Sequence, residues 1–385
     1  MSALFAVALI GISFFAYDTA RRAQVAVLES QSGSVSEASL DPAAPGFRAF
    51  TEPTPVALVL HTAVSATSGE GPDLVGASLL IASGSNVGGT VMSVPASIQR
   101  GGEPTLEVLF RQEGIDAVIT EVETIFAIGF GEVVSLDAAS WTTLMAPELP
   151  LDVALREDLV DSNGETLVAA GLGPFRLSDV AVIAGHRNPG EEALSVALRQ
   201  QEIWKSWISR SASSGRSELP LVEQGFVEVI TSLAGGPVNY RVVPIRASFG
   251  VGSESTYVLD EDIVALEIAQ LVPFPEPAVP GARTSLLLLD GTGGQADGSV
   301  ITSAVVLAGG QVAVLGNTDA AGAESSRIEV HAPDASGFAA ELASLLAGVP
   351  IVDVPLDDST VDATLVIGED LVGLDFAELS TEAAE

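Results

Sequence analysis

The chain has 385 residues, which corresponds to two or three domains at about 150 residues each. It carries 51 acidic and 16 basic residues, for a net charge of −35, and a field of that sign disfavours nucleic acid and anionic lipid headgroups as partners. The absence of cysteine excludes disulfides, thiolate metal sites and cysteine nucleophiles, while a mean hydropathy of +0.42 predicts substantial buried cores. We predict no metal site, because the three histidines lie far apart in the sequence.

The first residues are apolar. Residues 3–17 are 15 uninterrupted apolar or small residues, a helix of roughly 22 Å against a hydrocarbon core of roughly 30 Å. Arg21 and Arg22 follow this stretch and no basic residue precedes it, the reverse of what an anchor with its N-terminus inside requires. A cleaved signal peptide and a buried soluble helix are the alternatives. We expect a membrane anchor over residues 1–22 whose true start lies upstream, giving a single-pass plasma-membrane protein with its bulk outside the cytoplasm.

The next segments alternate between strand and helix patterns. Residues 23–54 are rich in Ser, Ala, Pro and Glu and predict a tether. A first domain over residues 55–272 begins with apolar strands at 55–64, 77–83 and 88–98, with "SNVGG" (85–89) as the hairpin turn. A helix is expected at 103–114, ending at a glycine, and another at 263–272. Between them, residues 120–139 predict a strand and a short helix.

A proline-rich linker, residues 273–283, separates this domain from a second one over residues 284–372. Strands at 284–290, 311–316, 326–332 and 362–368, together with a helix at 336–348 that Ser336 would cap, predict a small α/β domain. The "DGTGG" turn lacks the lysine and the spacing of a phosphate loop and predicts a tight turn. Residues 373–385 form an acidic tail.

The segment "GHRNPGEEALSVALRQQEIWKSW" (185–207) gathers the most polar chemistry of the chain. Asn188 is an expected helix N-cap, Pro189 the first helical residue and Glu191 the acid of a capping box. At 100° per residue, Arg199 lies off the apolar side of this helix, which predicts a solvent-side flank. The apolar stripe consists of Ala193, Val196, Ala197, Ile203, Trp204, Trp207 and Ile208. Because His186 and Arg187 precede a helix N-terminus, an anion site is the alternative to a purely structural helix, although two glutamates oppose it.

This segment resembles the part of the LytR-CpsA-Psr envelope proteins that contains R-x-R-H, a short gap and an arginine-bearing R-Q-Q helix. "SLLIASGSNVGGTVMSVPAS" (78–97) resembles the family's strand, turn and strand that end in I-P-R-D. Residues 151–187 resemble the approach to its arginine cluster, and residues 284–372 resemble a C-terminal domain often appended to these proteins. The order and spacing of these segments, over most of residues 55–372, carry the resemblance.

The resemblance implies an α/β/α sandwich that holds a polyprenyl-pyrophosphate lipid and, with a divalent cation such as Mg²⁺, transfers a glycopolymer phosphate onto peptidoglycan. In that family arginines clamp the pyrophosphate, and aspartates organise the metal or the attacking hydroxyl. By this resemblance Arg199 falls on a family arginine and is the candidate catalytic residue. His186 and Arg187, the latter one place out of register, are candidate ligand-binding residues.

The chain departs from the family pattern at its catalytic motifs. Ala96 and Ser97 replace the arginine and aspartate of I-P-R-D, and Gly76 stands where an aspartate is expected. Residues 184–187 read Ala-Gly-His-Arg in place of R-x-R-H. We therefore expect a degenerate, non-catalytic relative without a cofactor, with Mg²⁺ required only if activity remains.

Three functions stay open at this point. The first is a non-catalytic envelope protein that binds a polyprenyl-linked precursor or an envelope partner. The second is a divergent active phosphotransferase that uses Arg187, Arg199 and His186 with a borrowed Arg100 or Arg111. The third is a structural wall adaptor that acts through the C-terminal domain. Cations gathered around one groove would favour the second, and a filled groove would favour the third.

Overall fold

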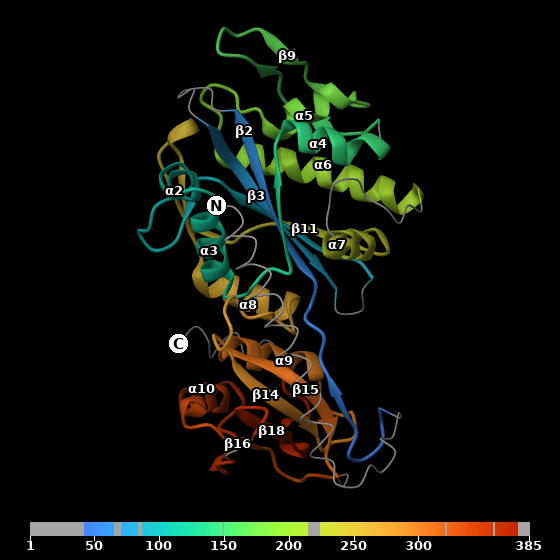
Figure 1. The fold of residues 1–385 in the computed structure, drawn as a ribbon, viewed down its shortest axis with the longest axis vertical. Helices are drawn as coiled ribbons and strands as arrows, with labels where there is room; N and C mark the ends of the chain where they lie inside the picture. Colours follow the sequence, from blue (N-terminus) through green and yellow to red (C-terminus); the bar gives the residue numbers. More distant parts are fainter. Residues whose placement is uncertain are drawn as a thin grey trace, which may run out of the picture.

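The computed structural model describes residues 42–64, 71–83, 87–148, 150–214, 224–319, 322–356 and 359–375. These residues form two α/β domains that follow one another along the long axis of the molecule (Figure 1). The expected anchor at 1–22 and most of the acidic tail lie outside the described residues. None of the helices within the described ranges is long and apolar enough to cross a bilayer.

The first domain is built on a five-stranded sheet in the order β11-β4-β3-β2-β6. β3 runs antiparallel to both of its neighbours, whereas β6 and β11 pair in parallel with β2 and β4 at the edges. The central strands are apolar along their length because both faces of the sheet are covered. The strands are β2 (Val56–Val64), β3 (Pro72–Ala82), β4 (Gly89–Pro95), β6 (Glu132–Leu136) and β11 (Val238–Val242).

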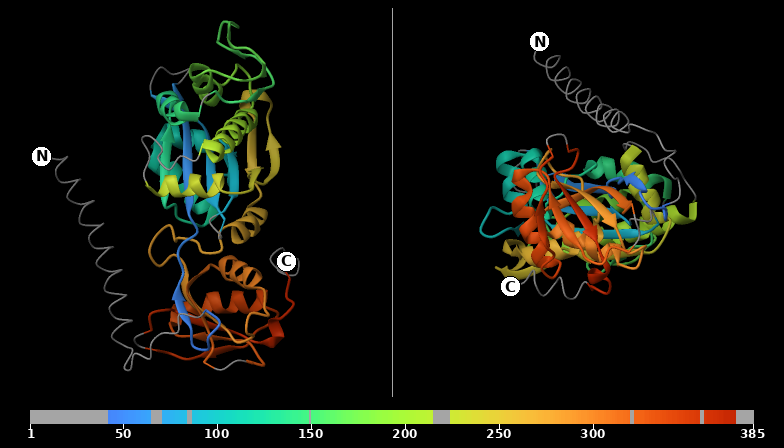
Figure 2. Two further views of the ribbon diagram at one scale, coloured as in Figure 1. Left: turned by 90° about the vertical axis from the view of Figure 1, so that its right-hand side faces the viewer. Right: turned by 90° about the horizontal axis from the view of Figure 1, so that it is seen from below.

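Helices cover both faces of this sheet, and each face has its own apolar core (Figure 2). One core packs beneath α4 (Ala138–Met145), α5 (Leu177–Gly185), α6 (Ala193–Ser214) and α7 (Gln224–Ala234). The other packs beneath α2 (Leu106–Glu113), α3 (Ile115–Phe126) and α8 (Glu261–Leu271). The predicted α/β/α sandwich is confirmed.

The helix expected at 103–114 is α2, and it ends at the predicted glycine. Thr105 caps its N-terminus, where the Thr105 hydroxyl accepts a hydrogen bond from the Val108 amide. Gly114 closes it with a φ of 91°, a conformation that glycine adopts without a steric penalty. The chain then starts α3 at once, so that residues 120–126 are helical and the strand expected within 120–139 is β6.

The first domain also contains three smaller sheets of short strands. β5 (Ile98–Gln99), β12 (Ile245–Phe249) and β13 (Thr256–Leu259) form a small sheet in the order β12-β13-β5. β7 (Ala154–Leu155) pairs with β10 (Gly171–Leu172), and β8 (Leu159–Val160) pairs with β9 (Thr166–Val168). Single 3₁₀ turns are η1 (Ala146–Glu148) and η2 (Gly252–Glu254).

The second domain holds a six-stranded sheet in the order β1-β15-β14-β18-β16-β17, so the predicted second α/β domain is confirmed. Its helices are α9 (Gly298–Leu307) and α10 (Ser336–Leu345), with single turns η3 (Pro333–Ala335) and η4 (Glu369–Leu371). Its own strands are β14 (Thr284–Asp290), β15 (Gly310–Asn317), β16 (Arg327–Val330), β17 (Ile351–Asp353) and β18 (Ala363–Ile367). Ser336 is not the N-cap of α10. It is the first helical residue, because η3 already turns the chain and the Ser336 hydroxyl bonds back to the Pro333 carbonyl.

The sixth strand, β1 (Arg48–Phe50), comes from the segment expected to be a tether. β1 pairs antiparallel with β15, and the Thr51 amide continues the ladder to the Ala313 carbonyl at 3.1 Å. The Asn317 side-chain amide donates to the Pro42 and Ala44 carbonyls, both at 2.8 Å. Residues 42–51 therefore belong to the second domain, and the tether prediction is wrong for them.

The proline-rich segment 273–283 is packed rather than free. The Gly129 amide donates to the Glu276 carbonyl at 2.7 Å, which fixes the segment to the first domain. At its end, the buried Arg283 guanidinium donates to the Ala127 carbonyl after α3 and to the Val306 and Gly310 carbonyls of the second domain. Burial lowers the pKa of Arg283 to about 10. This one side chain bonds both domains to each other.

Candidate functional site

The helix of the segment 185–207 is α6, and its apolar stripe is buried as predicted. All seven stripe residues are at most 2 % exposed. Trp204 packs against Trp141 and Trp207, with ring centroids 5.1 and 5.7 Å away, and its indole N–H donates to the Ser78 hydroxyl at 3.2 Å. All three tryptophans of the chain thus meet in one core between α6 and the sheet.

The start of the helix differs from the prediction, because α6 begins at Ala193 and Asn188 is not its N-cap. Gly190, with a φ of 78°, turns the chain before the helix begins. The Asn188 side chain instead bonds a different loop, accepting from the Val160 amide at 2.8 Å and donating to the Asp158 carbonyl at 2.9 Å. Glu191 still accepts the Asn188 amide at 2.8 Å, but it does so within a turn that precedes the helix.

Arg199 is buried, so the prediction of a solvent-side flank is wrong. The physical reason is that the C-terminal end of α5 packs against the flank of α6 that carries Arg199. The Arg199 Nε donates to the Ile183 carbonyl at 2.8 Å, and Nη2 donates to the His186 carbonyl. Its Nη1 forms an ion pair with Glu191, and the two side chains are only 8 % and 12 % exposed. Arg199 therefore places a cation on the carbonyls that end α5, where a helix favours positive charge.

His186 and Arg187 lie in the same network. The His186 Nε2–H donates to the Val160 carbonyl at 2.7 Å. Arg187 donates from Nε to the Glu191 carbonyl at 2.9 Å, from Nη1 to the Glu107 carboxylate at 3.3 Å and from Nη2 to the Ser253 carbonyl at 3.1 Å. The three candidate residues are thus brought together around residues 186–192, but each already bonds an acceptor of the protein.

The charge of this site is negative on balance. Two guanidinium groups, on Arg187 and Arg199, face the carboxylates of Glu107 and Glu191, and Glu192 lies next in the chain. Glu192 accepts hydrogen bonds from Tyr257 at 3.2 Å and from Ser255 at 3.4 Å. Burial, followed by the charge of Glu192, raises the pKa of Tyr257. With three carboxylates for two arginines, a bound pyrophosphate would have to displace the internal acids first.

The positions that depart from the family pattern are buried or face a neighbouring side chain at close range. Ala96 and Ser97 are each 1 % exposed, so position 96 has no room for an arginine in this packing. At Gly76, a Cβ atom would lie 2.5 Å from the Gln200 Oε1. Gln200 is buried and donates to the Ala184 carbonyl at 2.9 Å. The Gln200 side chain, on α6, thus occupies the space that an aspartate at position 76 would need.

Arg100 and Arg111, the arginines that a divergent transferase could borrow, also form ion pairs within the protein. The Arg100 Nε lies 3.1 Å from Glu121, and this hydrogen bond and charge raise the pKa of Arg100. Arg111 Nε lies 3.7 Å from Asp73. Within the described ranges, no group of three or more histidine, aspartate and glutamate side chains could hold a metal ion.

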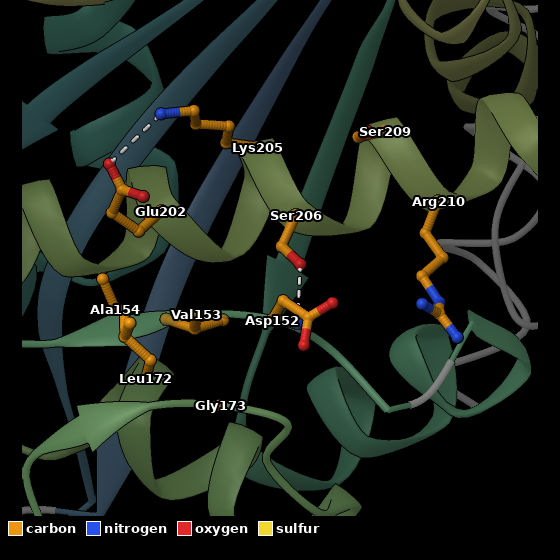
Figure 3. Close-up of a pocket in the computed structure, with 10 residues that line it drawn as sticks. All are labelled: Asp152, Val153, Ala154, Leu172, Gly173, Glu202, Lys205, Ser206, Ser209 and Arg210. Atoms are coloured by element: carbon orange, nitrogen blue, oxygen red, sulfur yellow. Dashed lines mark hydrogen bonds and ion pairs between the residues drawn. The ribbon is translucent and has the colours of Figure 1, made fainter.

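Two cavities lie elsewhere, and neither is lined by His186, Arg187 or Arg199. The larger, about 650 Å³, lies beside α6 and the β7–β10 pair (Figure 3). The smaller, about 320 Å³, lies where β14 and β15 end against residues 42–45. There the Asp290 carboxylate accepts hydrogen bonds from the Thr292 and Gly294 amides. The "DGTGG" stretch is therefore a tight turn whose amides bind the turn's own aspartate.

His61 on β2 is a buried polar residue whose surroundings were not predicted from the sequence. It stacks on Trp141 at 5.3 Å between ring centroids, and its Nε2 bonds the Ser78 hydroxyl at 2.9 Å. Burial lowers its pKa from 6.5 to about 3. The unfolded chain therefore binds a proton at this histidine between pH 6.5 and 3 that the folded chain does not bind, so His61 weakens folding as the pH falls through that range. Its place in an apolar run was the only sequence signal.

No protein-family model and no curated protein sequence matches this chain. Among solved structures, this chain is similar to TagT bound to LI-WTA, with 13% identity over 56% of this chain and 89% of that one, at a TM-score of 0.43. TagV of B. subtilis has 13% identity over 56% of this chain and 96% of that one, at a TM-score of 0.43. The LytR-CPS2A-psr family protein YwtF (TagT) with bound octaprenyl pyrophosphate lipid has 13% identity over 56% of this chain and 87% of that one, at a TM-score of 0.41. What this chain does is therefore inferred from its own sequence and side chains.

Proposed function

We propose that this chain is a membrane-anchored, extracytoplasmic envelope protein of the LytR-CpsA-Psr type that binds a polyprenyl-linked precursor or an envelope partner without transferring it. The ordered resemblance over residues 55–372 supports the envelope role. The proposed anchor at 1–22 rests on the apolar start of the sequence, and the outward orientation rests on the resemblance to the envelope family.

One observation carries the non-catalytic part of the proposal: every side-chain nitrogen of Arg187 and Arg199 donates to an internal carbonyl or carboxylate, six hydrogen bonds in all. Phosphoryl transfer depends on positioning and charge neutralisation, and one stabilising arginine can contribute about 10³ to 10⁵ in rate. Each charge-assisted hydrogen bond withdrawn from the protein to serve a phosphate would cost about 1.5–3 kcal/mol. Arginines held in this way stabilise the loop and are poor phosphate clamps.

We expect the purified protein neither to transfer a polyprenyl-linked glycopolymer onto peptidoglycan nor to hydrolyse the pyrophosphate, with Mg²⁺ or Mn²⁺ present. A radiolabelled polymer assay measures this, with an active transferase of the family as positive control. Metal-dependent turnover that Arg187→Gln abolishes would overturn the proposal. Arg187 is the better variant for this test because its side chain is 24 % exposed and its loss disturbs the fold less than the loss of Arg199.

A structural wall adaptor is the second candidate, and the filled core favours it. Trp141, Trp204 and Trp207 are fully buried between α6 and the sheet, where they leave the interior packed. In this case the second domain would make the contact with the wall. Wall sedimentation assays with the whole chain and with variants on the β17 edge would separate this role from precursor binding.

The proposed topology predicts that protease added to intact cells digests the second domain. Residues 55 onward would lie outside, so an antibody against the second domain should lose its signal while a cytoplasmic marker stays intact. Protection of that domain until the membrane is permeabilised would contradict the proposed orientation.

A further inference from the structure

The strand β17 forms an open edge of the sheet in the second domain. It is the last strand in the sheet order, and among the described residues it pairs with β16 alone. The Pro350 carbonyl and the Val354 amide both bond β16, each at 2.9 Å. Because backbone groups alternate in direction along a strand, the N–H and C=O groups of Ile351 and Asp353 point away from β16. These four groups form the open edge of β17.

The side chains along this edge are apolar and exposed. Ile351 is 44 % exposed, Val352 42 % and Leu356 52 %. Soluble proteins usually guard an edge strand with charges, prolines or bulges, because an exposed apolar edge pairs with other chains. Here Pro355 limits the length of the ladder, since it is the next outward-facing residue after Asp353 and has no N–H. The edge therefore suits a short partner strand.

The charge of the second domain sets the class of partner. Residues 284–372 contain 13 acidic residues and a single basic one, Arg327, which gives a formal charge of −12. Arg327 is itself paired with Glu329 at 2.6 Å, and Asp353 on the open edge is exposed. A field of this sign attracts a basic segment. It repels a polyanion, and it also repels a second copy of this chain, which carries the same charge.

We propose that the open edge of β17 binds a short basic segment of another protein as a seventh strand of the sheet. Main-chain hydrogen bonds to Ile351 and Asp353 supply the affinity, as they do when other sheets take up an added strand. The side chains of the added strand alternate between the two faces, so its basic residues lie beside Asp353 and its apolar residues cover Val352. This surface goes beyond the proposed function and does not depend on it.

The peptide acetyl-Lys-Val-Lys-Val-Lys-Val-amide tests the surface on the full-length chain. Amide hydrogen exchange resolved by NMR reports on the pairing directly. We expect the amides of Ile351 and Asp353 to exchange fast in the free protein and at least about tenfold more slowly when the peptide saturates the edge. A basic peptide that is held by charge alone would not protect these two amides.

N-methylated peptides separate strand pairing from charge. One peptide is methylated on its lysine amides and one on its valine amides, so both keep the charge of the parent. Only one of the two sets faces β17 in a paired strand. Calorimetry should therefore show that one methylated peptide binds about tenfold more weakly than the parent, whereas the other binds as well as the parent does.

Two variants locate the contact. Ile351→Pro removes an outward amide and should weaken binding about tenfold. Asp353→Asn should weaken it about threefold, as the loss of an exposed ion pair does. The control Asp319→Asn makes the same change at an exposed residue beyond β15, three strands away from β17, and should leave binding unchanged.

Three outcomes would overturn the proposal. The first is that both methylated peptides bind as well as the parent. The second is that Asp319→Asn weakens binding as much as Asp353→Asn does. The third is that the amides of Ile351 and Asp353 are already protected in the absence of peptide because two copies of the chain pair through β17, which sedimentation of the free protein would reveal.

Discussion

Trp204→Ala is expected to lower the free energy of unfolding by about 3–5 kcal/mol, as truncation of a buried tryptophan does. Trp204 is fully buried at the centre of the aromatic cluster, and its removal abolishes the ring contacts with Trp141, Trp207 and His61 and the hydrogen bond to Ser78. The substitution also leaves a cavity between α6 and the sheet that the packed core cannot close. Urea unfolding followed by far-UV circular dichroism measures the loss.

The matched control is Lys205→Ala, one residue further along the same helix. Its side chain is exposed, and surface substitutions change stability by no more than about 0.5 kcal/mol. If Trp204→Ala unfolded at the same urea concentration as the control, α6 would not pack on the sheet as described.

Arg199→Ala is expected to cost about 3–5 kcal/mol, because it breaks a buried ion pair from one side only. Glu191 would keep its charge at 12 % side-chain exposure without its partner, and the carbonyls of Ile183 and His186 would lose their donors. From the sequence alone, a solvent-side arginine would have changed stability by no more than about 0.5 kcal/mol. Thermal and urea unfolding distinguish these values easily.

A double-mutant cycle separates the ion pair from the other contacts of Arg199. Glu191→Gln in the Arg199→Ala background should cost less than it does alone, because the stranded carboxylate is removed. Arg327→Ala, an exposed arginine of the second domain, is the control for a lost charge. Additive effects of the two substitutions would show that Arg199 and Glu191 do not interact.

Local periodicity explains what could be predicted from the sequence. The stripe of α6 follows the 3.6-residue repeat, and the strands of both sheets are apolar runs between turn residues, so both were recognisable. α9 was missed because its buried residues, from Val300 to Val306, run without interruption and show no polar face. A helix that is covered on all sides has no amphipathic signal.

Partners distant in sequence explain what could not be predicted. The burial of Arg199 depends on the end of α5, and the side chain of Asn188 finds its acceptors and donors 28 and 30 residues away. β1 could not be predicted from the sequence, because it consists of three residues in a polar segment that pair with a strand more than 260 residues later. No pattern within 185–207 or 42–54 contains these contacts.

The candidate site shows the same division. The sequence identified the departures at Gly76, Ala96 and Ser97, but not that Gln200 of α6 occupies the space at position 76. Likewise, His186, Arg187 and Arg199 were recognised as a group, whereas their engagement by Glu107, Glu191 and backbone carbonyls required the fold. The three residues do lie together, and their hydrogen bonds hold the protein's own loops in place.

The most direct test of that conclusion is the hydrogen exchange of the arginine side chains, measured by ¹⁵N-resolved NMR with and without pyrophosphate. We expect the Nε–H of Arg199 to exchange slowly in the free protein, since it is buried on the Ile183 carbonyl, and neither Arg187 nor Arg199 to shift when pyrophosphate is added. Fast exchange in the free protein, followed by saturable shifts and protection with pyrophosphate, would show that these arginines form a ligand site and would contradict the structural role assigned to them.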